Sequence, residues 1–244
     1  MRLFFRRPAP AETIPPIQLP DGTALPVTVR HSVRARRIAL RLRLAEREVE
    51  LVLPSGASLP RALAFLESRR GWIAAQAARL PTRIPFVDGA VIPVLGVEHR
   101  LTALGIRRGT PPFRIREGMI EVTGLADHLA RRTKAGLRAH ARQMLADKTR
   151  ALAVRLGRPA GKITVGDAAS RWGSCSAAGN IKYSWRLVLA PERVLDYVAA
   201  HETAHLAEMN HSPRFWAVVE SLYGPFEAER HWLKQNGARL MLYG

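Results

Sequence analysis

The sequence predicts an α+β protein in which strands dominate the first half of the chain and helices the second. Apolar and polar side chains alternate between residues 25 and 53 and recur in short runs between 86 and 123, the pattern of half-buried strands. From residue 127 onward the apolar positions mostly recur at helical spacing. Residues 1–20 are rich in proline and show no periodicity. We therefore expect a flexible tail over 1–20, a basic β-rich region over 21–124 and a mainly helical domain over 125–244.

The first strands share one apolar face, and we expect them to form an antiparallel sheet. Their apolar positions are Leu25, Val27 and Val29, then Ile38, Leu40, Leu42 and Leu44, then Val49, Leu51 and Leu53. Arginines 34, 36 and 37 lie between the first two strands, where they form either a basic hairpin tip or a solvated turn. Ser58 is suited to cap a helix that runs to about Leu80.

Turn residues and apolar spacing define the later elements. Turns that separate short strands are expected at Asp88-Gly89, Leu95-Gly96, residues 110–112 and Glu117-Gly118. The longest helix is expected to begin at Asp127, to end at Gly157, and to pack behind a helix that follows Pro191. Strands over 162–165 and 181–190 flank a loop at 171–180 and form a second, small sheet.

The helix after Pro191 carries the motif His201-Glu202-Thr203-Ala204-His205. Residues four apart in an α-helix differ by about 40° in direction and about 6 Å along the axis. The imidazoles of His201 and His205 therefore point the same way and can share one metal ion. Glu202 lies between them, where its carboxylate can reach a water bound to that ion. This spacing is typical of zinc hydrolases.

A third ligand is expected just beyond this helix. Asn210 tolerates the left-handed conformation that ends helices, and Ser212-Pro213 is typical of the cap and first residue of a new helix. A chain that turns back at Asn210 brings His211 beside the ion. Glu208 is the competing ligand, but it lies about 10.5 Å beyond His201 along the helix axis. The spacing therefore favours His211.

Three imidazole ligands favour one zinc ion over magnesium or calcium and leave a fourth position open for water. Glu202 is then the expected general base in the hydrolysis of a peptide bond. Arg171 and Tyr183, from the preceding loop and strand, are candidates for binding the substrate and stabilising an oxyanion. Ordinary packing and ion pairing is the alternative for both residues.

Several segments in the second half, the histidine motif among them, together carry a family resemblance that is more specific than that motif alone. They are residues 171–176, 179–181, 185–187, 196–198, 201–205, 210–212 and 215–216. In their order and spacing the chain resembles the YgjP-like metallopeptidases, relatives of the WLM and SprT-type zinc proteases. The resemblance implies a zincin-like domain with zinc at His201, His205 and His211 and with Glu202 catalytic. It extends more weakly upstream to about residue 25. Thr203 departs from the expected bulkier apolar residue, but its interior position leaves the chemistry unaffected.

Composition indicates a globular, cytoplasmic protein without a membrane partner. At 244 residues, with 47% hydrophobic and 24% charged residues, the chain can bury a core. No apolar run approaches the 18 or so residues of a membrane span, and residues 1–7 contain too few apolar residues for a signal-peptide core. The single cysteine, Cys175, excludes a disulfide framework.

The net charge of +18 is concentrated upstream of the histidine motif. Residues 1–160 hold 29 Lys and Arg against 12 Asp and Glu, whereas residues 161–244 hold 9 against 8. The basic N-terminal region is therefore a candidate for binding nucleic acid or nucleotides. The alternative is a general preference for arginine, which supplies 33 of the 38 basic residues.

Three functions compete on this sequence. A zinc metallopeptidase acting on protein or peptide is favoured. A metal-dependent nucleotide pyrophosphatase of the UTP type could use the upstream arginines, but the sequence lacks the dense carboxylate cluster that phosphoryl chemistry usually requires. A nucleic-acid-binding protein with a structural zinc is the third, and it predicts a fourth ligand, for which Cys175 is the candidate.

Overall fold

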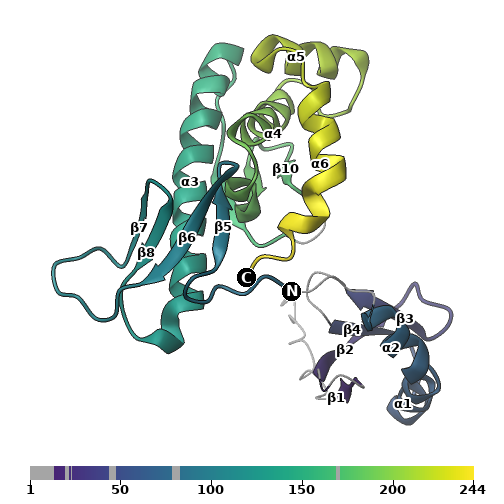
Figure 1. Cartoon of the computed structure of the whole chain (residues 1–244). Helices are drawn as coiled ribbons and strands as arrows, with labels where there is room; N and C mark the ends of the chain where they lie inside the picture. Colours follow the sequence, from purple (N-terminus) through teal and green to yellow (C-terminus); the bar gives the residue numbers. More distant parts are fainter. Residues whose placement is uncertain (1–13, 20–21, 23, 44–47, 79–82, 169–170) are drawn as a thin grey trace, which may run out of the picture. The chain divides into compact units, whose positions relative to one another are not determined.

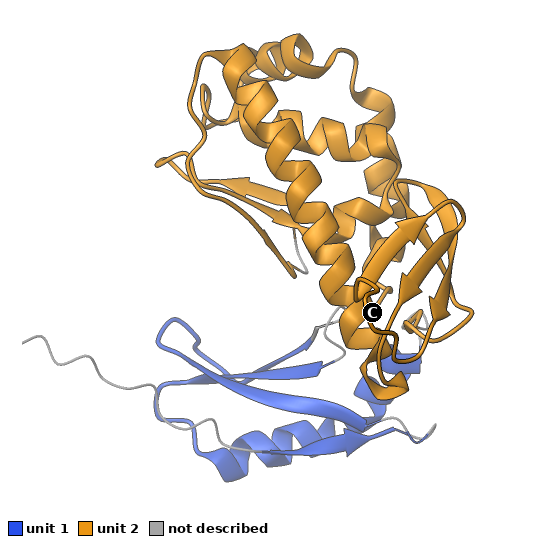
Figure 2. Cartoon of the chain, turned by 90° about the vertical axis from the view of Figure 1, so that its left-hand side faces the viewer, with its two compact units in different colours: residues 1–81 blue, residues 82–244 orange. Residues whose placement is uncertain are grey.

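The computed structural model describes residues 14–19, 22, 24–43, 48–78, 83–168 and 171–244. The chain divides into two compact units, residues 1–81 and residues 82–244 (Figure 2). The fold class is α+β, as the sequence predicts (Figure 1). Most of the expected tail, together with Leu44 and Leu80, lies outside the described residues.

The first unit is built on a sheet with the order β1-β2-β4-β3. Its strands are β1 (Ile14–Gln18), β2 (Ala24–Ser32), β3 (Ala39–Arg43) and β4 (Glu48–Pro54). The outer pairs are antiparallel, but the central β2·β4 pair is parallel, which differs from the antiparallel expectation. Since β2 and β3 are not neighbours, arginines 34, 36 and 37 lie on a connection between separated strands rather than on a hairpin tip.

Two features of this unit differ from the pattern read in the sequence. Strand β1 lies within the expected tail, where Ile14 and Ile17 are buried against β2. The helix expected after Ser58 is divided at Arg69 into α1 (Leu59–Ser68) and α2 (Arg70–Ala78). Both helices bury small and apolar residues against the sheet. These residues are Ala62, Leu66, Ile73 and Ala77.

The second unit begins with a sheet of the same design as the first. Strands β5 (Val91–Val94), β6 (Val97–Ala103), β7 (Phe113–Arg116) and β8 (Met119–Val122) have the order β5-β6-β8-β7. The outer pairs are again antiparallel and the central β6·β8 pair parallel. This topological repeat is not apparent from the sequence pattern. Because the sheet packs on the following helix, the units divide at 81/82 rather than at the expected 124/125.

That helix is α3 (Leu129–Leu156), preceded by the short 3-10 helix η1 (Ala126–His128). It ends at Gly157, whose backbone is left-handed, as the sequence predicts. Leu137, Ala141 and Leu145 are fully buried along one side. Lys148 pairs with both Glu192 (2.9 Å) and Asp196 (2.6 Å) and so links α3 to helix α4 (Glu192–Ala204).

A small sheet follows, with the order β10-β11-β9. Its strands are β9 (Ile163–Gly166), β10 (Gly173–Cys175) and β11 (Ile181–Ser184). The last strand is shorter than the expected span to residue 190, because the chain turns into the 3-10 helix η2 (Trp185–Leu189). Asp167 accepts hydrogen bonds from the Trp185 indole and the Arg186 guanidinium at this turn. The indole N–H of Trp185 and one N–H of Arg186 therefore find a partner outside the strand ladder.

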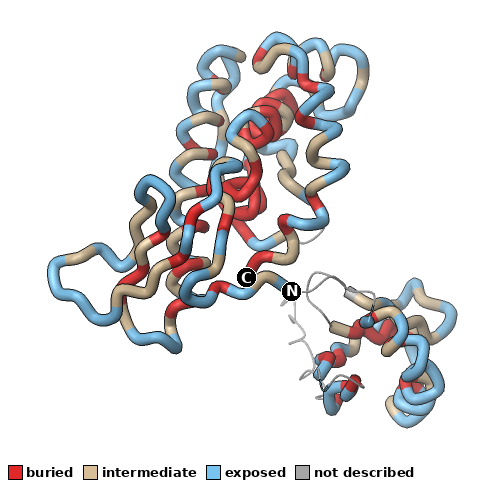
Figure 3. Tube along the Cα trace, in the orientation of Figure 1, coloured by how far each residue is buried: buried red, intermediate tan, exposed pale blue. Residues whose placement is uncertain are grey.

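Helix α4 (Glu192–Ala204) runs through the core of the second unit, and α5 (Pro213–Tyr223) and α6 (Glu227–Leu240) complete the fold. Figure 3 shows α4 as a largely buried helix, and α3, α5, α6, η2 and β10 pack around it. Nine of its thirteen residues are buried, Ala199, Ala200 and Ala204 among them. In the part of the chain that the structure describes, no helix is both long and apolar enough to span a membrane.

The packing of Phe113 on Gly136 generates a stability prediction. A Cβ at Gly136 would lie 2.5 Å from Cδ1 of the Phe113 ring, so Gly136→Ala forces the ring to move. The overpacking cost of about 1–3 kcal/mol should exceed the gain of about 1 kcal/mol in helix propensity. We expect a lower free energy of unfolding in urea. The matched control is Gly71→Ala in α2, where a Cβ meets nothing within 4 Å. Stabilisation by both substitutions would contradict this account.

Candidate metal centre

Helix α4 ends where the motif ends, and the following turn brings the third histidine back. Pro191 precedes the first turn with extended backbone, and His205 is the C-terminal cap. Among the described residues other than glycine, only Leu95 has a positive φ, so the expected left-handed exit at Asn210 is wrong. The Asn210 side chain instead accepts a hydrogen bond from the Ser212 backbone N–H (3.3 Å). Ser212 caps α5 as expected, with its Oγ accepting from the Phe215 N–H (3.4 Å).

This arrangement brings His201, His205 and His211 together. One ligand nitrogen from each lies within 4.8 Å of the others, and the Nε2 atoms of His201 and His211 are 3.1 Å apart. Nitrogens on a tetrahedral zinc ion, with bonds of about 2.05 Å, stand about 3.3 Å apart. The separation of these two nitrogens is therefore close to that in a zinc site. The imidazoles would need only a small movement to bind the ion.

The backbone after the motif fixes the orientation of His205. Its Nδ1 lies 3.0 Å from the Glu208 carbonyl oxygen, so Nδ1–H can donate there and leave Nε2 free for a metal. Glu208 thus orients the His205 ring through its backbone carbonyl. Its carboxylate is not among the clustered ligand atoms. This favours His211 over Glu208 as the third ligand.

Aromatic rings surround the three imidazoles. The buried Phe215 ring contacts all of them, with centroid distances of 4.9 Å to His201, 4.5 Å to His205 and 4.7 Å to His211. Trp216 lies 5.7 Å from His201 and from His211. These contacts restrict the orientation of the imidazoles.

Burial keeps the imidazoles in the form that binds metal. The pKa of His201 is lowered to about 4, first by burial and then by His205, His211 and Arg230. Burial also lowers the pKa of His205, and the neighbouring His211 adds to the effect despite an opposing hydrogen bond to Glu208. Both rings are neutral at pH 7, with unprotonated nitrogens to offer. Arg230 lies over the Trp216 ring, with its Cζ 5.0 Å from the ring centroid. No sequence pattern indicates that this residue lies near the histidines.

Glu202 is buried beside the histidines, with 6% of its surface exposed. Burial raises its pKa to about 7, and the positive charge of Arg171 opposes the shift. Its Oε2 atom is buried without a hydrogen-bond partner. An unpartnered buried carboxylate oxygen beside three imidazoles fits a metal ion that carries a water molecule.

The backbone of β10 approaches Glu202 closely at Gly173. A Cβ at this position would lie 2.5 Å from Cδ and Cγ of Glu202. Glycine is therefore required here for the carboxylate to keep its position. Sequence reasoning did not single out Gly173, although it belongs to the segment 171–176 that carries the family resemblance.

The two substrate-binding candidates are placed differently. Tyr183 is fully buried, and its hydroxyl lies 2.9 Å from Thr149 Oγ1, so it joins β11 to α3 and is not accessible to a substrate. Burial raises the pKa of this phenol far above its ordinary value. Arg171 is exposed and close enough to influence Glu202 electrostatically.

Cys175 is half-buried and is not part of the histidine cluster. Burial raises the pKa of its thiol, and the charge of Glu202 adds to that shift. A thiolate, the form that ligates metals and attacks carbonyls, is therefore disfavoured at this position.

Comparison with known proteins gives a family match over most of the chain. The family model of the YgjP-like metallopeptidase domain matches residues 37–236. No curated protein matches the sequence significantly. Among solved structures, the chain is similar to the metallopeptidase zymogen of Pyrococcus abyssi abylysin. The two are 23% identical over 38% of this chain and 92% of that chain, with a TM-score of 0.34.

The geometry of the cluster predicts the metal content of variants. We expect the wild-type chain to bind one divalent ion and His205→Ala to bind it at least about 100-fold more weakly, because one of three ligands is lost. Elemental analysis and metal titration measure both quantities. His140→Ala on α3 is the matched control, since His140 lies outside the cluster, and it should bind metal like the wild type. Undiminished affinity in His205→Ala would contradict the assignment.

Proposed function

Because the chain belongs to the YgjP-like metallopeptidase family, we propose that it hydrolyses peptide bonds with one zinc ion held by His201, His205 and His211. In this proposal Glu202 is the general base. The observation that supports it most strongly is the convergence of three imidazole nitrogens beside a buried carboxylate oxygen that has no partner.

The donor set supports zinc as the metal. Three imidazole nitrogens suit zinc, whereas magnesium and calcium prefer oxygen ligands. Three protein ligands leave an open coordination position, which is typical of catalytic rather than structural sites. A structural zinc would require a fourth ligand, and Cys175 does not join the cluster.

The bound zinc would supply a Lewis acid and a water molecule of lowered pKa. Glu202 would accept the proton of the attacking water at a carboxylate oxygen and pass it to the leaving amine. A carboxyl group whose pKa is about 7 is suited to both transfers at neutral pH. Gly173 leaves the space that this carboxylate occupies.

Strand β10 supports an extended peptide as the substrate. It lies at one end of the small sheet and packs against α4, so its outer edge can pair with an added strand. Arg171, which precedes β10 and is exposed, is proposed to contact the substrate near Glu202. For nucleotide hydrolysis, the described residues contain no carboxylate cluster that could hold a metal ion.

Glu202→Gln tests the general base. We expect this variant to keep its metal and to lose hydrolysis of a fluorescently labelled unfolded protein by about 10²–10⁴-fold, because the amide cannot accept the proton. The matched control is Glu208→Gln, which keeps the backbone carbonyl that faces His205 and should retain nearly full activity. Elemental analysis and turnover are measured on the same samples. Full turnover by Glu202→Gln would contradict the assignment, and release of pyrophosphate from UTP without proteolysis would contradict the substrate class.

Gly173→Ala tests the position of Glu202. The new methyl group would overlap the carboxylate, so we expect turnover to fall at least about 10-fold while the three imidazoles still bind metal. Ser174→Ala, one residue along the same strand, is the control and should change turnover less than about twofold. Equal turnover in both variants would show that Glu202 does not need the space at Gly173.

A further inference from the structure

A second, basic site lies on the second unit, apart from the metal centre. Helix α3 and strand β9 enclose a groove of about 900 Å³, here called the α3–β9 groove, and none of its lining residues belongs to the metal centre. Six basic side chains line it: Arg131, Lys134, Arg138, Arg142, Arg150 and Lys162. Only two carboxylates, Asp147 and Asp167, accompany them, so the lining carries four net positive charges.

The carboxylates are already paired, and three of the cations are not. Asp167 binds Lys134 (2.7 Å) and Arg186, and Asp147 binds Arg150 (3.3 Å). Within the described part of the chain, the side chains of three exposed lining residues form no ion pair or hydrogen bond. These are Arg131, Arg142 and Lys162. Their charge is left for an external anion.

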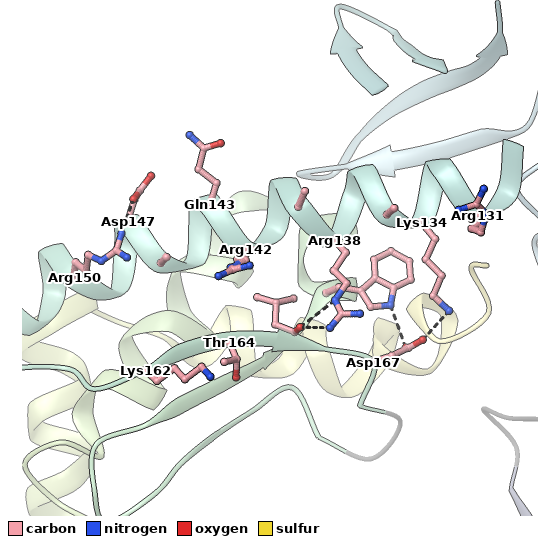
Figure 4. Close-up of a pocket in the computed structure, with 15 residues that line it drawn as sticks. Arg131, Lys134, Arg138, Arg142, Gln143, Asp147, Arg150, Lys162, Thr164 and Asp167 are labelled. Carbon is pink, nitrogen blue, oxygen red and sulfur yellow. Dashed lines mark hydrogen bonds and ion pairs between the residues drawn. The ribbon is translucent and has the colours of Figure 1, made fainter. Parts of the chain in front are cut away.

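The cations stand in a row. Lys134, Arg138 and Arg142 are four residues apart on α3, so they lie along one face at a rise of about 6 Å each. Figure 4 shows Lys134 and Arg138 extending toward β9, with Lys162 and Thr164 on the other side of the groove. A nucleic-acid strand carries one phosphate per about 3.4 Å of its axis. A row of cations therefore suits an anion with repeating charges, such as a phosphate backbone, better than it suits a small anion with one charged group.

The groove is poorly suited to a peptide. Strand β9 lies at the end of its sheet, but Arg138 donates two hydrogen bonds (3.1 and 2.9 Å) to the Val165 carbonyl oxygen on that edge. An added strand would have to displace this guanidinium. The large apolar lining residues, Val165 and Trp185, are buried, so they form no recess for a peptide side chain.

The groove also lacks the features that bind single strands. Trp185, its only aromatic lining residue among those described, is fully buried, and its indole N–H is bound to Asp167 (3.1 Å). No exposed ring is therefore available to stack on an unpaired base. The groove offers lysine, arginine and threonine, which contact phosphates without reading sequence.

We propose that the α3–β9 groove binds the phosphate backbone of a nucleic-acid duplex independently of sequence. This places the nucleic-acid contact on α3 and β9 of the second unit, not in the basic β-rich region over 21–124. The α3 cations nevertheless belong to the positive surplus of residues 1–160. The binding does not depend on the metal centre, because the two sites share no residue.

The test is fluorescence anisotropy of a labelled DNA duplex of about 20 base pairs, titrated with the full chain between about 50 and 200 mM salt. We expect Arg131→Glu, Arg142→Glu and Lys162→Glu together to weaken binding at least about 30-fold and to reduce the slope of log K against log salt by about 2 to 3. The control combines Arg108→Glu, Arg158→Glu and Lys234→Glu, exposed residues outside the groove with the same total change in charge. It should weaken binding less than about threefold.

Metal content and peptide hydrolysis of both triple variants show whether each is folded. Equal losses of affinity in the two variants would overturn the proposal, because binding would then follow net charge alone. No binding at the lower salt would also overturn it. Displacement of the duplex by poly-glutamate or by UTP at equal charge concentration would assign the groove to an acidic protein or to a mononucleotide instead.

Discussion

The burial of α4 is the constraint on which the metal centre depends. Helices α3, α5 and α6, together with β10 and η2, surround it and exclude water from the side that carries His201 and Glu202. Desolvation disfavours charge on both groups, so it lowers the pKa of His201 to about 4 and raises that of Glu202 to about 7. One physical effect thus supplies neutral ligands and a carboxyl group matched to proton transfer at neutral pH.

Features that depend on local periodicity could be predicted from the sequence. The spacing of His201 and His205 follows from helix geometry, and Ser212-Pro213 identifies the start of α5. The strand positions of Leu25, Val27 and Val29 follow from alternation in the same way.

Features that depend on contacts between distant segments could not be predicted. The parallel pairing of β2 with β4, the burial of Tyr183 against Thr149 and the approach of Gly173 to Glu202 each join residues separated by many positions. The arginines of α3 are visible in the sequence, but only the position of β9 makes them one side of a groove. Helix α3 therefore has two roles: Leu137, Ala141 and Leu145 pack into the core, while Lys134, Arg138 and Arg142 line the groove.

The most direct measurement of the central claim is X-ray absorption at the zinc edge on purified, zinc-loaded protein. The proposed centre predicts three imidazole nitrogens and one further light atom at about 2.0–2.1 Å from the metal, with no sulfur in the coordination shell. A sulfur ligand at about 2.3 Å would instead indicate a closed structural site that includes Cys175. A spectrum with only one imidazole would contradict the convergence of His201, His205 and His211.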